Sequence, residues 1–325
     1  NVLNFAALKI LGTNVVMDGG YGDDTITGTA GVDVVVAGGG NDTLNMGNGA
    51  YIYQVTGNVV GGWTSFQGYD IYADTGTSGT DTIKALGDGA VDIGLKKFDS
   101  TSGIEVVDGT GAKGIVRLLG EDQSNALNFA ALKILGTNVV IDGGYGDDTI
   151  TGTAGNDTVA VSGGNDILNM DNGSDTYQDT GNVAGGWTSF QGYDTYTDKG
   201  TTGTDTIKAL GDGAVDIGFK KFDASTGIEV IDGTGAKGTV RLLGDDQNNI
   251  LDFSSVKLTG SNLVIDGGYG DDLITGNAAA NIALGGGGND TLDLGDGADT
   301  YQVTGNVLGG WSSFQGYDTY ADSGA

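Results

Sequence analysis

Aspartates spaced nine residues apart carry the most distinctive chemistry in this sequence. Asp24, Asp33 and Asp42 each stand sixth in a nonapeptide of the form Gly-Gly-x-Gly-x-Asp-x-apolar-x. Glycines at the first, second and fourth places permit positive φ, so a six-residue loop can turn its carbonyl groups toward one point. Carboxylate and carbonyl oxygens are the ligands that Ca²⁺ selects. The spacing therefore predicts calcium-binding loops; the alternative is that these aspartates only cap glycine-rich turns.

The nonapeptide register recurs in two later stretches, and it resumes after an interruption at Gly76 and again at Gly200. Asn281 replaces one aspartate, and we expect its amide oxygen to coordinate without supplying charge. Several Ca²⁺ ions are expected. The predicted side-chain ligands are Asp24, Asp33, Asp42, Asp81, Asp148, Asp157, Asp166, Asp175, Asp205, Asp272, Asn281, Asp290 and Asp299. The loop glycines predicted to contribute to the metal sites are Gly20, Gly22, Gly144, Gly146, Gly268 and Gly270.

These nonapeptides resemble those of the RTX (repeats-in-toxin) family, whose repeats build a parallel β-roll that binds Ca²⁺ between stacked loops. The resemblance implies that two nonapeptides form one coil and that each ion lies between loops two nonapeptides apart. The loop of Asp24 then pairs with the loop of Asp42. The partner of Asp33 falls at Tyr51, so the family pattern lacks a ligand there, whereas Asp175 and Asp299 are present at the equivalent positions.

A much longer repeat is superimposed on the nonapeptides. Trp63, Trp187 and Trp311 lie 124 residues apart, and the copies are nearly identical. We expect modules at 1–124 and 125–248 and a partial module at 249–325, in a fragment of a longer protein. In arrays of this kind each unit packs chiefly on its neighbours, and they serve reach, spacing or multivalency.

Short apolar strands between glycine-rich turns predict an all-β fold, a right-handed parallel β-roll or β-helix solenoid. Residues 57–74 break the register and are expected to form a protruding loop or hairpin. Residues 85–140 are rich in Val, Ile and Leu at intervals of roughly ten, which favours metal-poor coils with Glu105 and Asn125 near the ligand position. Residues 5–11 could form one helical turn.

Aromatic residues recur in the stretch that breaks the register. They could form a stacking platform for sugar rings or for a partner, or they could pack the stretch onto the solenoid. We favour packing. The candidate platform consists of Trp63, Tyr69, Trp187, Tyr193, Trp311 and Tyr317.

Composition excludes several classes of function. The 325 residues include 64 Gly, no Pro, Cys or His, and a net charge of −29, which argues against nucleic acid, whose phosphates need cationic partners. Disulfides, thiolate metal sites and histidine bases are absent. No stretch approaches the apolar length that a membrane span requires. Acidic pairs are abundant, but nothing singles out a catalytic dyad, so we expect no enzyme.

The expected function is structural. We expect a calcium-stabilised array from a large secreted or cell-surface bacterial protein, acting as a stalk, matrix fibre, filament, sheath or surface-layer component. The RTX resemblance implies type I secretion, with Ca²⁺ binding supplying folding free energy outside the cell. The alternatives are an adhesin whose aromatic loop binds surface glycans, and the non-catalytic tail of a secreted enzyme. Copies of the chain could associate end to end or laterally.

Overall fold

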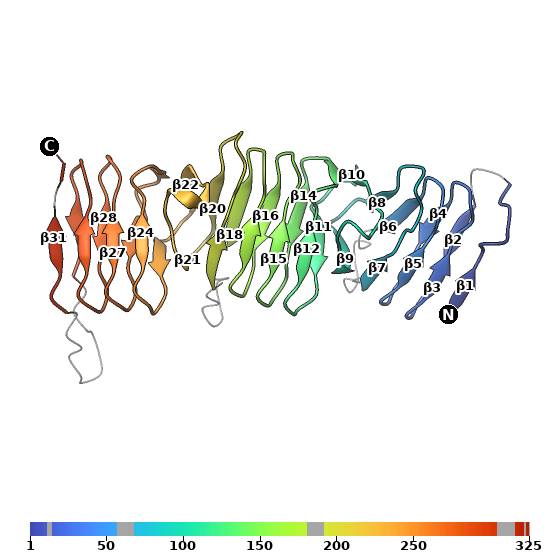
Figure 1. Ribbon diagram of the computed structural model, residues 1–325, viewed down its shortest axis with the longest axis horizontal. Coiled ribbons are helices and arrows are strands. Elements are labelled where there is room, and N and C mark those ends of the chain that lie inside the picture. The colour runs from blue at the N-terminus through green and yellow to red at the C-terminus, as the bar shows by residue number, and fades with distance from the viewer. Residues whose placement is uncertain (12–14, 57–67, 181–191, 304–315, 322, 325) are drawn as a thin grey trace. The chain divides into compact units, whose positions relative to one another are not determined.

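Short strands and tight turns alternate along the chain. The computed structural model describes residues 1–11, 15–56, 68–180, 192–303, 316–321 and 323–324. It divides into two compact units, Asn1–Val159 and Ala160–Ala325. Within each unit, strands from successive coils lie side by side (Figure 1). Strand β16 (Thr158–Val161) contains the division.

The strands of the first unit are three to seven residues long. They are β1 (Val2–Asn4), β2 (Val16–Asp18), β3 (Thr25–Thr27), β4 (Val34–Val36), β5 (Thr43–Asn45), β6 (Ile52–Thr56), β7 (Tyr69–Tyr72), β8 (Thr82–Gly87), β9 (Val91–Lys97), β10 (Val106–Ala112), β11 (Val116–Gly120), β12 (Ala126–Asn128), β13 (Lys133–Leu135), β14 (Val139–Asp142) and β15 (Thr149–Thr151).

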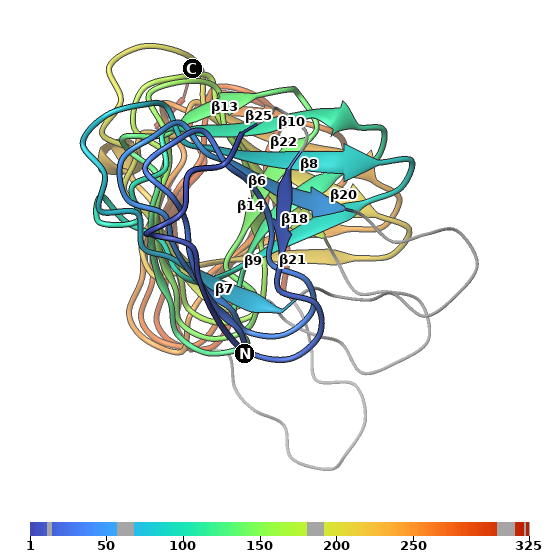
Figure 2. The ribbon, with the colours of Figure 1, turned by 90° about the vertical axis from the view of Figure 1, so that its right-hand side faces the viewer.

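Parallel pairing in the first unit follows the nonapeptide register. Strands β1, β3, β5, β7, β9, β11 and β14 are neighbours in that order in one sheet, and β2, β4, β6, β8, β10 and β13 in another. Figure 2 shows β6, β8 and β10 on one wall of the coil and β7 and β9 on another. Ile26 pairs with Leu44, so one coil takes 44 − 26 = 18 residues, or two nonapeptides. The predicted coil length is confirmed here.

The second unit repeats this arrangement with strands of two to seven residues. They are β17 (Ile167–Asn169), β18 (Thr176–Thr180), β19 (Tyr193–Tyr196), β20 (Thr206–Gly211), β21 (Val215–Phe219), β22 (Val230–Ala236), β23 (Val240–Gly244), β24 (Ile250–Asp252), β25 (Lys257–Thr259), β26 (Leu263–Asp266), β27 (Leu273–Thr275), β28 (Ile282–Leu284), β29 (Thr291–Asp293), β30 (Thr300–Tyr301) and β31 (Thr319–Ala321).

Pairing in the second unit is also parallel, with coils of several lengths. Ile274 pairs with Leu292, an offset of 292 − 274 = 18 residues in a nonapeptide stretch. Val215 pairs with Val240, an offset of 240 − 215 = 25 residues in a stretch without nonapeptides. Each unit is therefore an all-β parallel β-roll solenoid, as the sequence predicts.

The core is built from the apolar residues at the eighth place of each nonapeptide. Side chains alternate between the two faces of a strand, and the central residues of β3, β4 and β5, namely Ile26, Val35 and Leu44, are buried. Each such side chain contributes about 1.5–3 kcal/mol on burial. In the longer coils of the second unit, Phe222 and Phe253 stack with ring centroids 4.7 Å apart.

Two local expectations need correction or fall outside the described residues. Where one helical turn was expected at residues 5–11, the structure has a single hydrogen-bonded turn, in which Leu8 N–H donates to Phe5 O at 2.8 Å, and no assigned helix. In the second copy, the corresponding segment ends in strand β13. Within the described residues the helical element is a single 3-10 turn, η1 (Ala224–Thr226). Most of the predicted loop at 57–74 lies outside the described residues. No described helix is long and apolar enough to cross a bilayer.

Candidate metal centre

Glycines with positive φ form the loops that precede the strands. Gly20 and Gly22 have φ values of 88° and 93°, a conformation in which an L side chain is strained. A Cβ added to Gly38 would lie 1.8 Å from the carbonyl oxygen of Gly20, one coil away. Glycine therefore lets the loops of successive coils stack backbone on backbone. The other predicted glycines, Gly144, Gly146, Gly268 and Gly270, also have positive φ.

The sixth-place aspartates form a ladder along the stacked loops of the first unit. The backbone N–H of Asp24 donates to Oδ1 of Asp42 at 2.7 Å. The N–H of Asp42 donates to Oδ1 of Asp70 at 3.0 Å. Each carboxylate is thereby fixed with one oxygen toward the preceding loop. The link from Asp24 to Asp42 joins loops that are two nonapeptides apart, as the RTX resemblance implies. The link from Asp42 to Asp70 spans 28 residues, because the stretch that breaks the register lies between them.

A second ladder in the first unit uses the loops of the other strands. Tyr51 N–H donates to Oδ1 of Asp81 at 2.8 Å, and Asp81 N–H donates to Oε2 of Glu105 at 2.7 Å. Glu105 thus continues the carboxylate ladder into the longer coils, near the ligand position where the sequence placed it.

The second unit contains the same ladders. Two of them begin at asparagines: the Asn249 N–H donates to Asp272, and the Asn281 N–H donates to Asp299, each at 2.8 Å. The remaining links join Asp166 to Asp194, Asp175 to Asp205, Asp205 to Glu229, Asp272 to Asp290, and Asp290 to Asp318, with N···O distances of 2.7–3.2 Å.

Several ladder carboxylates bury an oxygen that has no hydrogen-bond partner. This holds for Oδ2 of Asp24, Asp42, Asp272 and Asp290, and these four side chains belong to residues that are at most 3% exposed. An unpartnered buried oxygen costs about 1–3 kcal/mol, and more where the group is charged. Buried carboxylate oxygens beside stacked carbonyl groups are a donor set that suits Ca²⁺, so the residues present fit the predicted metal.

Carboxylates accumulate along the ladders, and their burial changes their pKa values. Burial, together with the charge of Asp290, raises the pKa of Asp272 to about 7. Burial also raises the pKa of Asp81 to about 7, with Asp74 and Glu105 adding to the shift. A divalent cation would favour the ionised forms of these groups.

Three buried aspartates converge in the second unit. One carboxylate oxygen each from Asp175, Asp198 and Asp205 lies within 4.8 Å of the other two. Asp175 and Asp205 were predicted as ligands from the sequence, but Asp198 was not. Asp198 lies beyond the register break, just after strand β19, and its Oδ2 accepts a hydrogen bond from the Tyr177 hydroxyl at 3.1 Å.

Other predicted ligands lie in a different setting. Both oxygens of Asp33 accept hydrogen bonds from Thr29, whose N–H is 2.8 Å away and whose hydroxyl is 2.9–3.0 Å away. Asp157 is held in the same way by Thr153. These contacts are those of the turn-capping alternative, and a metal-binding role of both aspartates stays a prediction.

Sequence reasoning missed Asp70, Asp194 and Asp318. Each follows a Gly-Tyr pair directly after the register break. A signal was present, because Gly68, Asp70 and Tyr72 fall at the fourth, sixth and eighth places of a nonapeptide without its first glycines. The pairing of Tyr72 with Leu44 places this segment in register with the loops.

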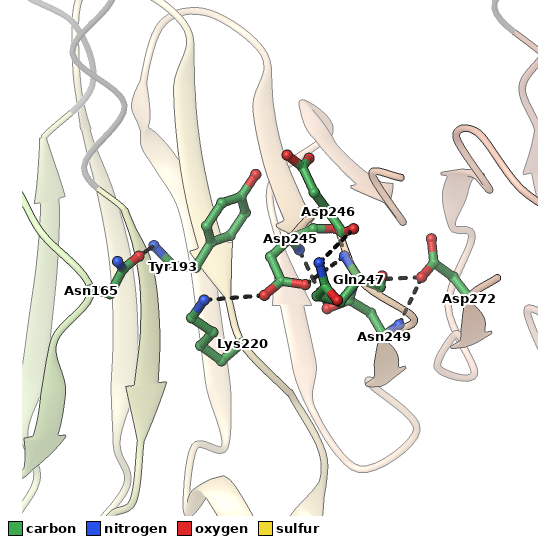
Figure 3. A network of polar contacts seen from close by, with 8 residues as sticks. All are labelled: Asn165, Tyr193, Lys220, Asp245, Asp246, Gln247, Asn249 and Asp272. Carbon is green, nitrogen blue, oxygen red and sulfur yellow. Dashed lines mark hydrogen bonds and ion pairs between the residues drawn. The ribbon is translucent and has the colours of Figure 1, made fainter. Parts of the chain in front are cut away.

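The candidate aromatic platform is only partly described. Trp63, Trp187 and Trp311 lie outside the described residues. Tyr69 is half-buried in β7, and Tyr317 is exposed. Tyr193 begins β19, where Lys220 Nζ lies 5.6 Å from the centre of its ring (Figure 3).

Two tyrosines close to the candidate platform in sequence pack in the core. Tyr72 and Tyr196 are buried. Tyr72 packs edge-on against Tyr53 with ring centroids 5.3 Å apart, and Tyr196 packs against Tyr177 at 5.2 Å. For these two tyrosines the preferred packing interpretation agrees with the structure.

Comparison with known families agrees with the ladder geometry. Residues 18–52, 142–177 and 266–301 match the family described as RTX calcium-binding nonapeptide repeat (4 copies). No curated protein matches the chain. The matched segments contain the stacked loops with the orphaned carboxylate oxygens of Asp24, Asp42, Asp272 and Asp290. These three segments are calcium-binding nonapeptide repeats of the RTX type.

Proposed function

We propose that the chain is a calcium-stabilised structural array of a large secreted bacterial protein and that it acts without catalysis. The observation that carries the proposal is the set of buried, unpartnered oxygens on Asp24, Asp42, Asp272 and Asp290. Stacking the loops brings these oxygens together, and an ion between the loops offsets their repulsion. The ion is therefore a structural part of the folded chain.

Binding to the folded state alone converts ion affinity into stability. A site adds about 2.7 kcal/mol when the free ion is at 100 times its Kd. Several such sites are enough to decide whether a chain with net charge −29 is folded or unfolded. The chain would stay unfolded where Ca²⁺ is scarce and fold where it is abundant, which suits secretion followed by folding outside the cell.

Repetition supports a structural role rather than a catalytic one. The same ladder recurs as Asn125 with Asp148 and as Asn249 with Asp272, 124 residues apart, with N···O distances of 2.7 and 2.8 Å. A stalk, fibre, sheath or surface-layer component needs such identical stacking units, because each coil supplies the surface on which the next one packs.

Two adjacent aspartates provide a matched test. Asp272 is a buried ladder member, whereas Asp271 is exposed and accepts a hydrogen bond from Asn289 N–H at 2.8 Å. Asp272→Asn and Asp271→Asn remove the same charge from neighbouring positions. In equilibrium dialysis with metal analysis, Asp272→Asn is expected to bind at least one Ca²⁺ fewer than the wild-type chain, and Asp271→Asn the same number.

Equal losses in the two variants would mean that net charge, not the ladder, holds the ions. A wild-type chain that binds no Ca²⁺ would reject the proposal altogether. Circular dichroism of both variants at saturating Ca²⁺ checks that the strands have formed.

A further inference from the structure

Not all of the stacked loop positions carry the same donor set. At four positions on the described ladders, a side-chain hydrogen-bond donor of the chain itself lies among three or more loop oxygens. Three of these donors are carboxamides, those of Asn125, Asn249 and Asn281, and the fourth is the Tyr51 hydroxyl.

The three carboxamides share contacts with two carbonyl groups of their own loop and with a carboxylate of the next coil. Asn125 Nδ2 donates to the carbonyl groups of Glu121 and Gln123 in its own loop, with the Glu121 oxygen 2.8 Å away. It also lies 3.3 Å from Gly143 O and 3.1 Å from Asp148 Oδ1 in the next coil. The amide nitrogen is thus surrounded by acceptors from two stacked loops, the surroundings that a cation requires.

Asn249 and Asn281 repeat this geometry in the second unit. Asn249 Nδ2 contacts Asp245 O at 3.0 Å, Gln247 O at 2.6 Å and Asp272 Oδ1 at 3.4 Å (Figure 3).

Asn281 Nδ2 contacts Asn277 O at 3.0 Å, Leu294 O at 3.5 Å and Asp299 Oδ1 at 3.4 Å, and it also donates to Ala279 O. The sequence predicted the amide oxygen of Asn281 as a ligand, but the nitrogen is the atom that faces the acceptors.

Tyr51 reaches the corresponding position from the opposite loop. Its hydroxyl lies 2.8 Å from Thr29 O and 3.3 Å from Met46 O, and it also contacts Asn48 O. Burial raises the pKa of Tyr51 to about 12, so the hydroxyl keeps its proton at neutral pH. A Cβ on Gly49 would lie 2.6 Å from the hydroxyl oxygen, so the space around it is closed.

The loops of Tyr51 and Asn281 are the same part of the 124-residue repeat. Residues 28–33 and 46–51 correspond to residues 276–281 and 294–299 after two repeats of 124. In the first copy the donor is a phenol from the later loop, and in the third copy it is an amide from the earlier loop. Two unrelated side chains therefore fill one position between the same pair of loops.

We propose that Asn125, Asn249, Asn281 and Tyr51 replace calcium ions, so that these four inter-loop positions take no cation. The inference rests on the proposed calcium function, and it specifies which inter-loop positions bind Ca²⁺ and which do not. Donors in these places satisfy the loop acceptors before any ion arrives. Asn249 then begins the run of ladder carboxylates Asp272, Asp290 and Asp318 and supplies a pre-formed surface on which the calcium-dependent coils stack.

The test restores a carboxylate at a filled position and counts ions. Asn125→Asp and Asn281→Asp change one atom each, and Asp157 stands naturally at the repeat position of Asn281. The control is Asn128→Asp, because exposed Asn128 only caps a turn and Asp252 stands at its repeat position. In equilibrium dialysis, each of the first two variants is expected to bind one Ca²⁺ more than the wild-type chain, and the control the same number.

A second variant tests the phenol. Tyr51→Asp introduces the residue found at the repeat position, Asp175, and is also expected to add one ion if the strands form. An unchanged ion count with tighter binding in Asn125→Asp and Asn281→Asp would overturn the proposal, since the amide oxygens would then already be ligands. If the wild-type chain and all variants bind no Ca²⁺, the calcium function itself fails together with the inference.

Discussion

A buried carboxylate oxygen without a hydrogen bond destabilises the folded chain unless it binds a cation or the carboxylate is protonated. On the ladders, Asp42 and Asp290 bury such an oxygen beside stacked loops, where an ion can reach it. Asp179 is different, because it lies in strand β18 rather than in a loop, and both of its carboxylate oxygens are buried without a hydrogen-bond partner. Its repeat positions are Val55 and Val303.

Asp179 is expected to make stability depend on pH. Burial raises its pKa from 3.8 to about 8, and the charge of Asp216 adds to the shift. Because the folded-state pKa is raised, the unfolded state ionises first, and stability falls as the pH rises from about 4 to about 8. Asp179→Val should therefore stabilise the chain by about 1–3 kcal/mol at pH 8 and by less at pH 5, measured by urea denaturation at saturating Ca²⁺.

The reciprocal substitution is the control for Asp179. Val55→Asp should bring the same pH dependence into the first unit, where Val55 is 9% exposed. A stability difference between Asp179→Val and the wild-type chain that is the same at pH 5 and pH 8 would contradict the account.

Single-residue roles were predictable only where the register defines them. The nine-residue spacing predicted the ladder positions of Asp42 and Asp290. Asp70 was missed because the preceding aromatic stretch removes the first glycines of its nonapeptide. The donor role of Asn281 depends on which amide atom faces the loop oxygens, and sequence spacing carries no information about that orientation.

Stacked loops are the elements that turn this sequence into metal-binding geometry. The backbone of the loop that contains Gly38 lies directly against the loop of Gly20. Gly39 N–H donates to Gly20 O at 2.8 Å. Positive φ and close backbone contact are two different reasons for glycine at these positions. Gly20 and Gly38 distinguish the two reasons, because their φ values are similar, 88° and 101°, but only Gly38 of the two has backbone atoms within 4 Å of an added Cβ.

Alanine substitutions should distinguish strain from stacking. Gly20→Ala is expected to cost about 1–2 kcal/mol, the cost of a left-handed conformation. Gly38→Ala is expected to cost about 2–5 kcal/mol, because a steric cost of about 1–3 kcal/mol adds to the same strain. Urea denaturation at saturating Ca²⁺ measures both. Equal losses would show that the loops are not packed as closely as described.

Both arginines of the chain lie in the longer coils and pair with aspartates there. Arg117 makes a bidentate contact with Asp92 at 2.8–2.9 Å, and Arg241 makes the same contact with Asp216 at 2.6–2.7 Å. Exposed pairs of this kind contribute about 0–1 kcal/mol each. On the ladders, Asp42, Asp272 and Asp290 instead bury a carboxylate oxygen that has no hydrogen-bond partner, and we expect ions rather than lysines and arginines to neutralise them.

Element types were more predictable than element ends. Short apolar triplets after each loop, such as those at Ile26 and Ile274, were expected as strands because side chains alternate with period two. The segment at residues 5–11 was expected to form one helical turn. Its copy at 129–135 instead ends in β13, which pairs with β10, so sheet pairing overrides local preference.

At the scale of the whole molecule, negative charge opposes folding. The chain carries 43 acidic and 14 basic side chains, and such an excess repels itself in a compact state. Burial of the eighth-place side chains and ion binding between loops both favour folding. Removal of Ca²⁺ should therefore shift the balance toward the unfolded chain.

The most direct measurement is a calcium titration of the whole chain, followed by far-ultraviolet circular dichroism with Mg²⁺ as the control. A cooperative change from coil to β-structure with Ca²⁺ is predicted, and little or none with Mg²⁺, which requires stricter octahedral geometry and retains its waters. Full β-structure in excess chelator, unchanged by added Ca²⁺, would contradict the claim that ions between the stacked loops hold this fold together.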